Sequence, residues 1–292
     1  MSSVFNSYFR SYDGTKIYYE VRGEGEPIVL IYGIACLINH WHFQIEELSK
    51  KHKVICYDLR GHHKSDVPMN VGSLSLESLG KDLSHLLREL NIKKAHIVGH
   101  SFGAQVILKA YELYPQIFKS LIFVNGFAKN PIKGMFGLDI FEKLFYWIKS
   151  NYDSNPILFD SIWQASINNP ISMIASGLMG GFNLELTQFK DIEIYAKGVS
   201  QVPLRVFLSY FEDMISFDGL DVAKKITAPT LILSGDKDSI TPMKFQHELH
   251  HAIVGSEFVT IPYGSHCSQL DFPDYISLKI SDFVERTASE LK

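Results

Sequence analysis

Residues 95–114 read AHIVGHSFGAQVILKAYELY and contain the pattern Gly-x-Ser-x-Gly, with Ser101 between Gly99 and Gly103. The β-branched run before the serine predicts a short buried strand, and the apolar spacing after it predicts an amphipathic helix. A serine on so sharp a turn has a strained backbone, so the residues two positions away must be small. The first N–H groups of the helix then face the serine, which suits an oxyanion forming beside it. The three residue types match by chance in roughly one chain in ten, so the strand and helix context carries the inference of a nucleophile.

The composition is that of an ordinary globular protein. The chain has 292 residues, of which 46% are hydrophobic and 21% charged, enough for one large domain with an insertion. The formal net charge is −4 and the sequence pI is near 6.3, with no basic run, so we expect no nucleic-acid partner. The first residues lack a charged stretch leading into an apolar core, and no uncharged apolar run is long enough to span a bilayer. We therefore expect no stable membrane insertion, a cytoplasmic location, and a monomer or homodimer.

The three cysteines, Cys36, Cys56 and Cys267, are odd in number and widely spaced. This spacing argues against a disulfide framework and against a thiolate metal site. We expect the three thiols to be buried as small hydrophobic groups. The sequence predicts neither a metal nor a cofactor.

Apolar runs alternate with helical patterns in the first third of the chain and again near its end. Continuous apolar runs such as 28–31 and 54–57 are typical of strands buried on both faces, which occur in parallel sheets with helical crossovers. We expect strands at residues 16–21, 28–32, 54–58, 95–98, 121–125, 229–235 and 257–261, and helices near 41–50 and 76–90, after Ser101, from 241 and up to 285.

The strand and helix rhythm stops for about ninety residues in the middle of the chain. From roughly residue 129 to residue 220 the sequence is helical and aromatic, and prolines and a Gly-Gly pair interrupt it. This pattern predicts an inserted helical cap at residues 129–220 within a core made of residues 1–128 and 221–292.

A serine hydroxyl needs a base to accept its proton, and the base needs an anionic group to orient it. In an open parallel sheet these groups lie on loops that follow the carboxyl ends of strands. The loop after 121–124 begins with Asn125 and offers no carboxylate, whereas the loop after 230–234 offers Asp236 and Asp238. The loop after 257–261 offers one histidine, His266. The order serine, aspartate, histidine is one of the known arrangements of the triad, and either aspartate fits it.

The chain resembles the α/β-hydrolase superfamily, in its capped serine-hydrolase branch, over nearly its whole length. The resemblance implies an α/β fold with a mostly parallel eight-stranded sheet, helices on both faces and an inserted helical cap. Five short segments carry it: 99–103 (GHSFG), 32–34 (YGI), 58–65 (DLRGHHKS), 235–242 (GDKDSITP) and 264–266 (GSH).

The resemblance also implies site residues. It selects Asp238 as the triad acid, with Asp236 as a turn residue, and it assigns the oxyanion hole to the backbone N–H groups of Ile34 and Phe102. The chain departs from the family where Tyr32 replaces the common histidine before Gly33, and where His63 replaces a glycine. The oxyanion loop has a single glycine, and in this it resembles the subgroup of the family that acts on unhindered esters.

Relatives that open epoxides or remove halides use an aspartate where this chain has Ser101, so the resemblance favours acyl transfer through a serine ester. We expect a serine hydrolase for carboxylic esters, or for related lactones or thioesters. The same triad also serves carbon–carbon bond hydrolases, acyltransferases and cofactor-free perhydrolases. From another class, a ligand-binding receptor with little turnover could use the same pocket.

The predicted cap is rich in large apolar residues and has no arginine pair or lysine cluster suited to an anionic substrate; Arg205 stands nearly alone. Most of the apolar side chains would form the cap's own core, and the rest would line an apolar pocket. We expect a small-molecule substrate with a small or medium apolar acyl or alcohol part. The candidate pocket residues are Phe136, Phe145, Trp163 and Met173.

Residues 247–251 read HELHH and match His-Glu-x-x-His, which on a helix can hold zinc with the glutamate as general base. The match falls near the end of a short helix that Gly255 closes, and the sequence supplies no third ligand downstream except His266, which already has a role. This favours a solvated helix end over a zinc peptidase. His40, His42, His62 and His63 are likewise interpreted as polar loop residues.

Overall fold

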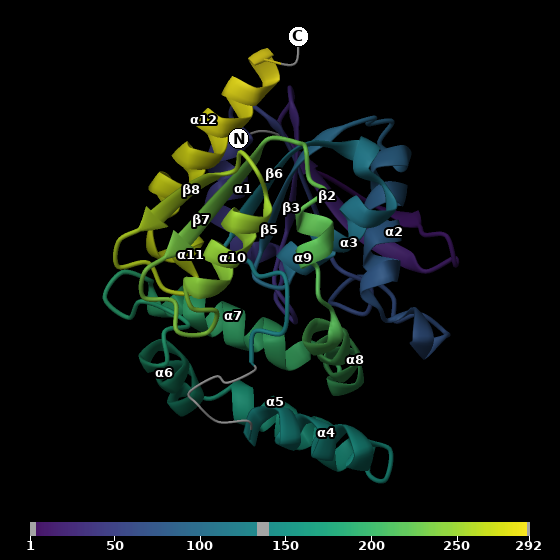
Figure 1. Ribbon diagram of the computed structural model, residues 1–292. Coiled ribbons are helices and arrows are strands. Elements are labelled where there is room, and N and C mark those ends of the chain that lie inside the picture. The colour runs from purple at the N-terminus through teal and green to yellow at the C-terminus, as the bar shows by residue number, and fades with distance from the viewer. Residues whose placement is uncertain (1–3, 133–139, 291–292) are drawn as a thin grey trace.

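The computed structural model describes residues 4–132 and 140–290, built around one eight-stranded sheet in the order β1-β2-β4-β3-β5-β6-β7-β8 (Figure 1). Neighbours from β4 through β8 pair in parallel, and β2 is antiparallel to both of its neighbours. The expected fold class is confirmed. The strands are β1 (Phe5–Arg10), β2 (Lys16–Arg22), β3 (Pro27–Ile31), β4 (Lys53–Tyr57), β5 (Ala95–His100), β6 (Phe118–Val124), β7 (Thr230–Gly235) and β8 (Glu257–Ile261).

Helices cover both faces of the sheet. On one face of the sheet α1 packs against α12 (Figure 1). On the other face α2 packs against α3, α3 packs against α9, and α9 packs against α10. The bounds are α1 (His42–Leu48), α2 (Leu76–Glu89), α3 (Gly103–Leu113), α9 (Leu220–Ala223), α10 (Lys244–Ala252), α11 (Ser268–Asp271) and α12 (Pro273–Glu290), with short 3-10 turns η1 (Ile38–Trp41), η2 (Val71–Ser73) and η3 (Pro115–Ile117).

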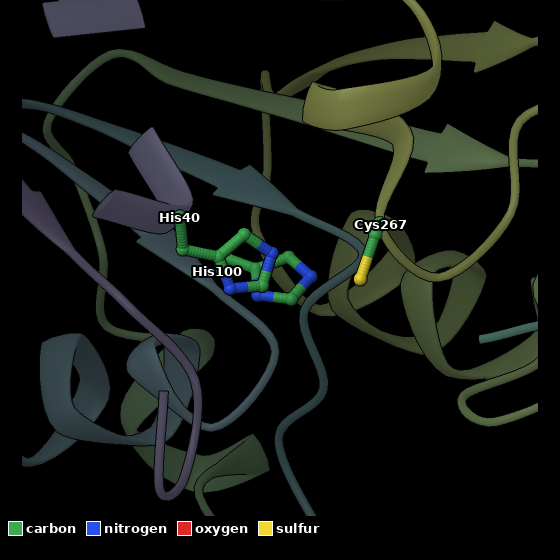
Figure 2. Close-up of side chains that lie close together, drawn as sticks. All are labelled: His40, His100 and Cys267. Atoms are coloured by element: carbon green, nitrogen blue, oxygen red, sulfur yellow. The ribbon is translucent and has the colours of Figure 1, made fainter. Parts of the chain in front are cut away.

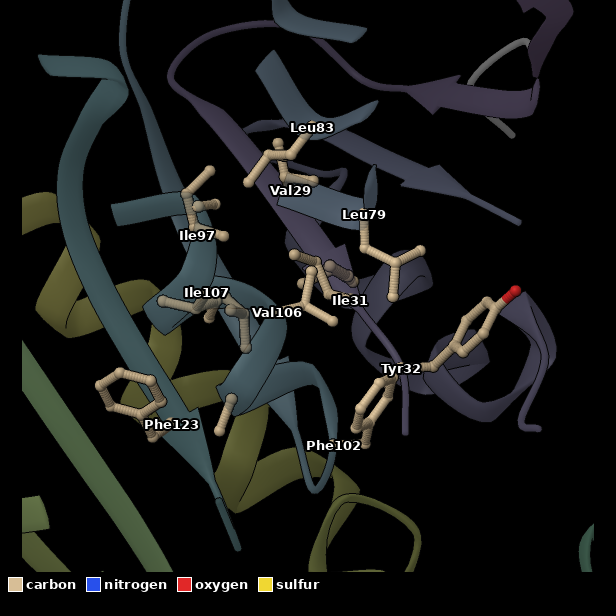
Figure 3. Close-up of a cluster of buried hydrophobic side chains, with 14 of the residues drawn as sticks. Val29, Ile31, Tyr32, Leu79, Leu83, Ile97, Phe102, Val106, Ile107 and Phe123 are labelled. Carbon is tan, nitrogen blue, oxygen red and sulfur yellow. The ribbon is translucent and has the colours of Figure 1, made fainter. Parts of the chain in front are cut away.

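The core between the sheet and helices α2 and α3 is mainly apolar. Figure 3 shows Val29 and Ile97 on the central strands, with Leu83 of α2 close to them and Ile107 of α3 below. All four side chains are completely buried, as the continuous apolar runs predict for strands covered on both faces. This packing fixes β5 and α3 relative to each other, and therefore fixes the turn between them.

The residue patterns did not reveal β1. Its sequence, FNSYFR, mixes polar and aromatic residues, and Phe9 is its one buried side chain. An edge strand that pairs on one side only and faces solvent needs no apolar run, so the hydrophobic pattern carries no signal for it. The eighth strand was expected from the family resemblance alone.

Among the described residues, six helices lie between β6 and β7. The first five form the segment Ile140–Ser216, which we call the helical insertion. It lies beyond the carboxyl ends of the parallel strands, at the bottom of Figure 1. None of the helices in the described ranges combines the length and the apolar character needed to cross a membrane. The helices of the insertion are α4 (Ile140–Tyr152), α5 (Pro156–Ile167), α6 (Pro170–Leu178), α7 (Phe189–Gln201) and α8 (Leu204–Ser216).

Candidate active site

Ser101 lies on the turn between β5 and α3 with a backbone φ of +54°. Its N–H bonds to the carbonyl of Val124 at 3.1 Å, so the turn remains attached to β6. A methyl group on Gly99 would lie 2.7 Å from the carbonyl oxygen of Gly103, and one on Gly103 would lie 2.7 Å from the carbonyl oxygen of Ile31. Both glycines are therefore required by close backbone approach, because no side chain fits at such distances.

His266 connects the serine to a carboxylate. Its Nε2 lies 2.9 Å from Ser101 Oγ, and its Nδ1 lies 2.9 Å from Asp238 Oδ2. Because an ionised carboxylate only accepts, this pattern puts the proton on Nδ1 and leaves Nε2 free to accept the serine proton. Serine and carboxylate are both largely buried, with 8% and 5% of their surface exposed, so little water competes for these bonds.

The two aspartates of the loop after β7 have different partners. Asp238 Oδ1 accepts the N–H groups of Ile240 and Thr241, at 2.9 and 2.8 Å, and the Thr241 hydroxyl lies 2.8 Å from Oδ2. Asp236 is exposed and accepts the N–H of Tyr263 at 2.7 Å. The structure thus places Asp238 beside His266 and gives Asp236 a role in joining two loops.

Asn125, which follows β6 and has a φ of +48°, holds the loop of His266 in place. Its side-chain nitrogen lies 2.7 Å from the carbonyl of Ser265 and 2.6 Å from that of His266, and its side-chain oxygen accepts the N–H of Gly235 at 2.8 Å. This function of Asn125 was not predicted from the sequence, which showed only that the loop after β6 offers no carboxylate. The available signal was a polar residue directly after a buried parallel strand, at the edge of the sheet where the site forms.

Ile34 and Phe102 provide two backbone N–H groups beside the serine. The turn before Ile34 touches Ser101, because a methyl group on Gly33 would lie 3.1 Å from Ser101 Cβ. Among the described residues, neither of the two N–H groups donates a hydrogen bond. Both are thus available to a ligand oxygen.

Two histidines brace the loop that carries Ile34. His62 Nε2 accepts the N–H of Ala35 at 3.2 Å, and His63 Nε2 donates to the carbonyl of Cys36 at 2.8 Å. Burial lowers the pKa of His62 to about 3, so its ring is neutral and can accept at Nε2. His63, which replaces a glycine of the family pattern, thus has a structural function. His62, expected as a polar loop residue, lies in a loop and is fully buried.

Comparison with known proteins agrees with this fold. The sequence model of a protein family described as "alpha/beta hydrolase fold" matches residues 26–273. The chain belongs to the α/β hydrolase fold family. It is 24% identical over 91% of its length to 94% of a protein of Azorhizobium caulinodans named "Putative carbamate hydrolase RutD", and 26% identical over 93% of its length to 77% of mouse (Mus musculus) epoxide hydrolase 4. A solved esterase from Exiguobacterium antarcticum superposes with a TM-score of 0.80, covering 96% of this chain and 100% of the esterase at 21% identity. The expectation of an enzyme of the hydrolase class is confirmed at that level.

In this α/β hydrolase a cavity of about 490 Å³ extends from the serine into the helical insertion. Phe145 of α4 and Trp163 of α5 line it, together with Ser101 and His266. None of the described lining residues is Asp, Glu, Lys or Arg. An apolar stripe on α8 forms another wall: Leu204, Phe207, Leu208 and Phe211. The i, i+3, i+4, i+7 spacing of this stripe is the signal that could have identified it in the sequence.

Of the four predicted pocket residues, Phe145 and Trp163 line this cavity and Met173 does not. The Met173 side chain on α6 is buried against a cluster that includes Phe182 and Ile192 of the helical insertion, and it does not reach the cavity wall. The prediction for Met173 is therefore wrong. Phe136 lies outside the described residues.

The HELHH run lies on α10, where His247 and His251 are exposed. Their rings stack with centroids 6.2 Å apart, and Glu248 pairs with Lys129 at 3.1 Å. Within residues 4–132 and 140–290, the one group of three or more potential metal ligands with mutually close ligand atoms lies elsewhere, at His40, His100 and Cys267. In the described chain, α10 therefore lacks the third ligand that a zinc peptidase needs.

Proposed function

We propose that this α/β hydrolase cleaves neutral carboxylic esters, or the related lactones or thioesters, through an acyl-enzyme on Ser101. The observation that carries the proposal is the hydrogen-bonded series Ser101, His266 and Asp238 at the wall of a cavity without charged lining residues. This is the arrangement that turns a serine hydroxyl into a nucleophile.

The geometry supports two half-reactions. In the first, Ser101 Oγ attacks the ester carbonyl carbon while its proton moves to His266 Nε2; the carbon–oxygen bond then breaks and the leaving alkoxide takes this proton. In the second, water gives a proton to Nε2 and its oxygen attacks the acyl carbon, which releases the acid and returns the proton to Ser101. In both, the N–H groups of Ile34 and Phe102 would stabilise the oxyanion.

Asp238 keeps the imidazole in the required orientation. Its carboxylate is fixed by the Ile240 and Thr241 contacts, so it stays in line with His266 Nδ1. When His266 holds the serine proton, the ring carries a positive charge, and the adjacent carboxylate stabilises that charge.

The cavity supports the substrate class. Its volume of about 490 Å³ is in the range of small-molecule sites, and its uncharged lining favours a neutral ligand with an apolar acyl or alcohol part. We also propose that residues 129–220 act as a cap on a core of residues 1–128 and 221–292, since α4, α5 and α8 contribute walls to the cavity that contains Ser101. A serine in place of an aspartate nucleophile argues against epoxide opening. The cytoplasmic location and the monomer or homodimer state remain predictions, which cell fractionation and light scattering test.

The test is hydrolysis of p-nitrophenyl esters from acetate to dodecanoate, with a p-nitrophenyl carbamate as an additional arm. Wild type, Ser101→Ala and wild type with a chelator are measured in parallel. We expect turnover that Ser101→Ala abolishes and the chelator leaves unchanged, with a chain-length optimum set by the cavity. Chelator-sensitive turnover that survives Ser101→Ala would instead assign the chemistry to His247 and His251 of α10.

Absence of turnover on every ester would contradict the proposal and favour a receptor or a carbon–carbon bond hydrolase. Added alcohol or peroxide distinguishes the related activities: faster product release with transfer of the acyl group to the additive would identify an acyltransferase or a perhydrolase.

A further inference from the structure

Three side chains from distant parts of the chain converge behind the triad. His40 comes from η1, His100 ends β5, and Cys267 precedes α11 (Figure 2). One potential ligand atom of each lies within 4.8 Å of the other two, and all three residues are buried. We propose that these residues form a binding site for a thiophilic d¹⁰ cation, Zn²⁺, and that the bound cation inhibits hydrolysis.

His100 has a ring nitrogen prepared for a cation. Its Nε2 donates to the carbonyl oxygen of His266 at 2.8 Å, which places the ring proton on Nε2 and the free lone pair on Nδ1. That Nδ1 is buried and has no hydrogen-bond partner among the described residues. A buried acceptor without a partner is unusual, because such groups are ordinarily satisfied. A cation would satisfy it.

His40 can offer the same atom. Its Nδ1 is also buried without a partner in the described chain, and its Nε2 lies 2.5 Å from the side-chain amide nitrogen of Gln269. That nitrogen donates to Nε2 and leaves the ring proton on Nδ1. Turning the amide, whose Oε1 is buried without a partner among the described residues, lets Oε1 accept from Nε2–H and frees the lone pair on Nδ1 for the cation. The rings of His40 and His100 have centroids 5.0 Å apart. Burial, with a smaller contribution from His266, lowers the pKa of His40 to about 3, so the ring is neutral, as a ligand must be.

Cys267 supplies the soft ligand. Burial raises the pKa of its thiol well above the ordinary value, so the S–H bond persists until a cation displaces the proton. Binding therefore forms one zinc–sulfur and two zinc–nitrogen bonds and releases the thiol proton to solvent. Sulfur and imidazole nitrogen together are the donor set that zinc takes in tetrahedral sites.

The size and access of the site are compatible with zinc. Bonds of about 2.0–2.3 Å in tetrahedral geometry place ligand atoms roughly 3.3–3.8 Å apart. The ligand atoms lie at most 4.8 Å apart, so their separations need to shorten by at most about 1.0–1.5 Å, which side-chain torsions can supply. His100 and Cys267 line the cavity that leads to Ser101, which gives the ion an entrance and leaves the fourth position for water.

Inhibition of hydrolysis by the bound cation rests on the proposed function. It follows from the short distance between the cation site and His266. The rings of His100 and His266 have centroids 4.9 Å apart. His266 becomes positively charged while it holds the serine proton, and a cation bound to its neighbour repels that charge. Zinc at this site would also hold Cys267, the residue directly after His266, and so restrict the imidazole.

The binding test uses Co²⁺ as a spectroscopic probe for Zn²⁺ on the metal-free enzyme. Wild type and Ser101→Ala should both show thiolate-to-cobalt absorption in the near ultraviolet, lost in Cys267→Ala and displaced by Zn²⁺. His40→Ala and His40→Gln should weaken binding by at least about 10-fold. Because Ser101→Ala is included, a failure of the esterase proposal leaves this result unaffected.

Two matched controls distinguish this site from others. The double variant His247→Ala/His251→Ala removes the exposed pair on α10, and His96→Ala removes a buried histidine bonded to Ser120, remote from the cluster. Both should keep the cobalt band. With an ester substrate, micromolar Zn²⁺ should reduce wild-type turnover at least about 10-fold, a chelator should restore it, and His40→Ala should be resistant.

Equal zinc inhibition of wild type and His40→Ala would overturn the proposal, since zinc would then act at His266 itself. A cobalt band that survives Cys267→Ala would overturn it as well. If these variants fail to fold, calorimetry of wild type in buffers of different ionisation enthalpy decides: release of one proton per zinc supports the site, and release of none refutes it.

Discussion

The side-chain nitrogen of Asn125 lies 2.6 Å from the main-chain oxygen of His266, so the loop after β6 fixes the loop that carries the imidazole. The same side chain accepts the N–H of Gly235 at the end of β7. One neutral residue thus links the strand beside the serine turn to the loops of both Asp238 and His266. The triad depends on this contact as well as on its own hydrogen bonds.

Asn125→Asp should lower kcat by about 10- to 100-fold with little change in KM, because the introduced oxygen repels two carbonyl groups and displaces His266. The free energy of unfolding should fall by about 1–3 kcal/mol, since buried groups lose their partners. Steady-state kinetics and urea unfolding measure the two effects. Asn6→Asp, at an exposed position of β1, is the control. Unchanged kcat in a folded Asn125→Asp would refute the positioning function.

Substitution of the two aspartates after β7 should have clearly different effects on kcat. Asp238→Asn should reduce kcat on the order of 10⁴-fold, because an amide favours the wrong tautomer of His266. Asp236→Asn should stay within a few-fold of wild type, because the exposed Asp236 carboxylate bonds to the N–H of Tyr263 and pairs with Lys237 at 3.7 Å rather than with His266. Comparable losses in both variants would show that the loop, rather than the carboxylate beside His266, determines activity.

Acid should destabilise the protein partly through His62. Its pKa is lowered from 6.5 to about 3 by burial, so between these values the unfolded chain binds a proton that the folded chain does not. The stabilisation is therefore complete above pH 6.5 and is lost as the pH falls toward 3, by up to about 1.4 kcal/mol per pH unit. His62→Gln should show a shallower decline in urea unfolding between pH 7 and pH 4. Identical slopes would contradict a neutral His62.

The uncharged cavity should favour neutral substrates over anionic ones. A hexanoate ester should react with kcat/KM at least about 100-fold above that of the adipate half-ester anion, because transferring a carboxylate into the cavity costs several kcal/mol. Ser166→Lys, at an exposed cavity-lining position of α5, should narrow the difference, whereas Ser161→Lys, exposed on the same helix but not lining the cavity, should not. Preference for the anion in wild type would refute the apolar pocket.

Much of the fold was predictable because it depends on local patterns. The runs at β3 and β4 are apolar on both faces, and the Gly-Ser-Gly turn between β5 and α3 places Ser101 at the carboxyl edge. Loops that follow parallel strands meet at that edge, so Asp236, Asp238 and His266 could be named as candidates without coordinates. The choice between the aspartates needed the family resemblance, since both follow the same strand.

The remaining features depend on contacts between distant segments. The residues around Asn125 and His62 do not indicate which distant loop each of these side chains binds. Met173 failed as a pocket residue because helical spacing shows that a side chain is buried but not against which neighbour. The wide spacing of the cysteines argued against a thiolate metal site, yet the fold brings Cys267 close to His40 and His100. Spacing detects such sites only when the ligands are close in the chain.

Hydrogen-bonded neighbours in the triad are 165 and 28 positions apart along the chain, and the helical insertion lies inside the longer interval. A cut between α5 and α6 would therefore leave Ser101 on one fragment and both of its partners on the other. Neither fragment alone would contain a complete set of catalytic groups. Co-expressed halves would regain ester turnover only on reassociation, which makes this interval a natural division point for a split-enzyme reporter.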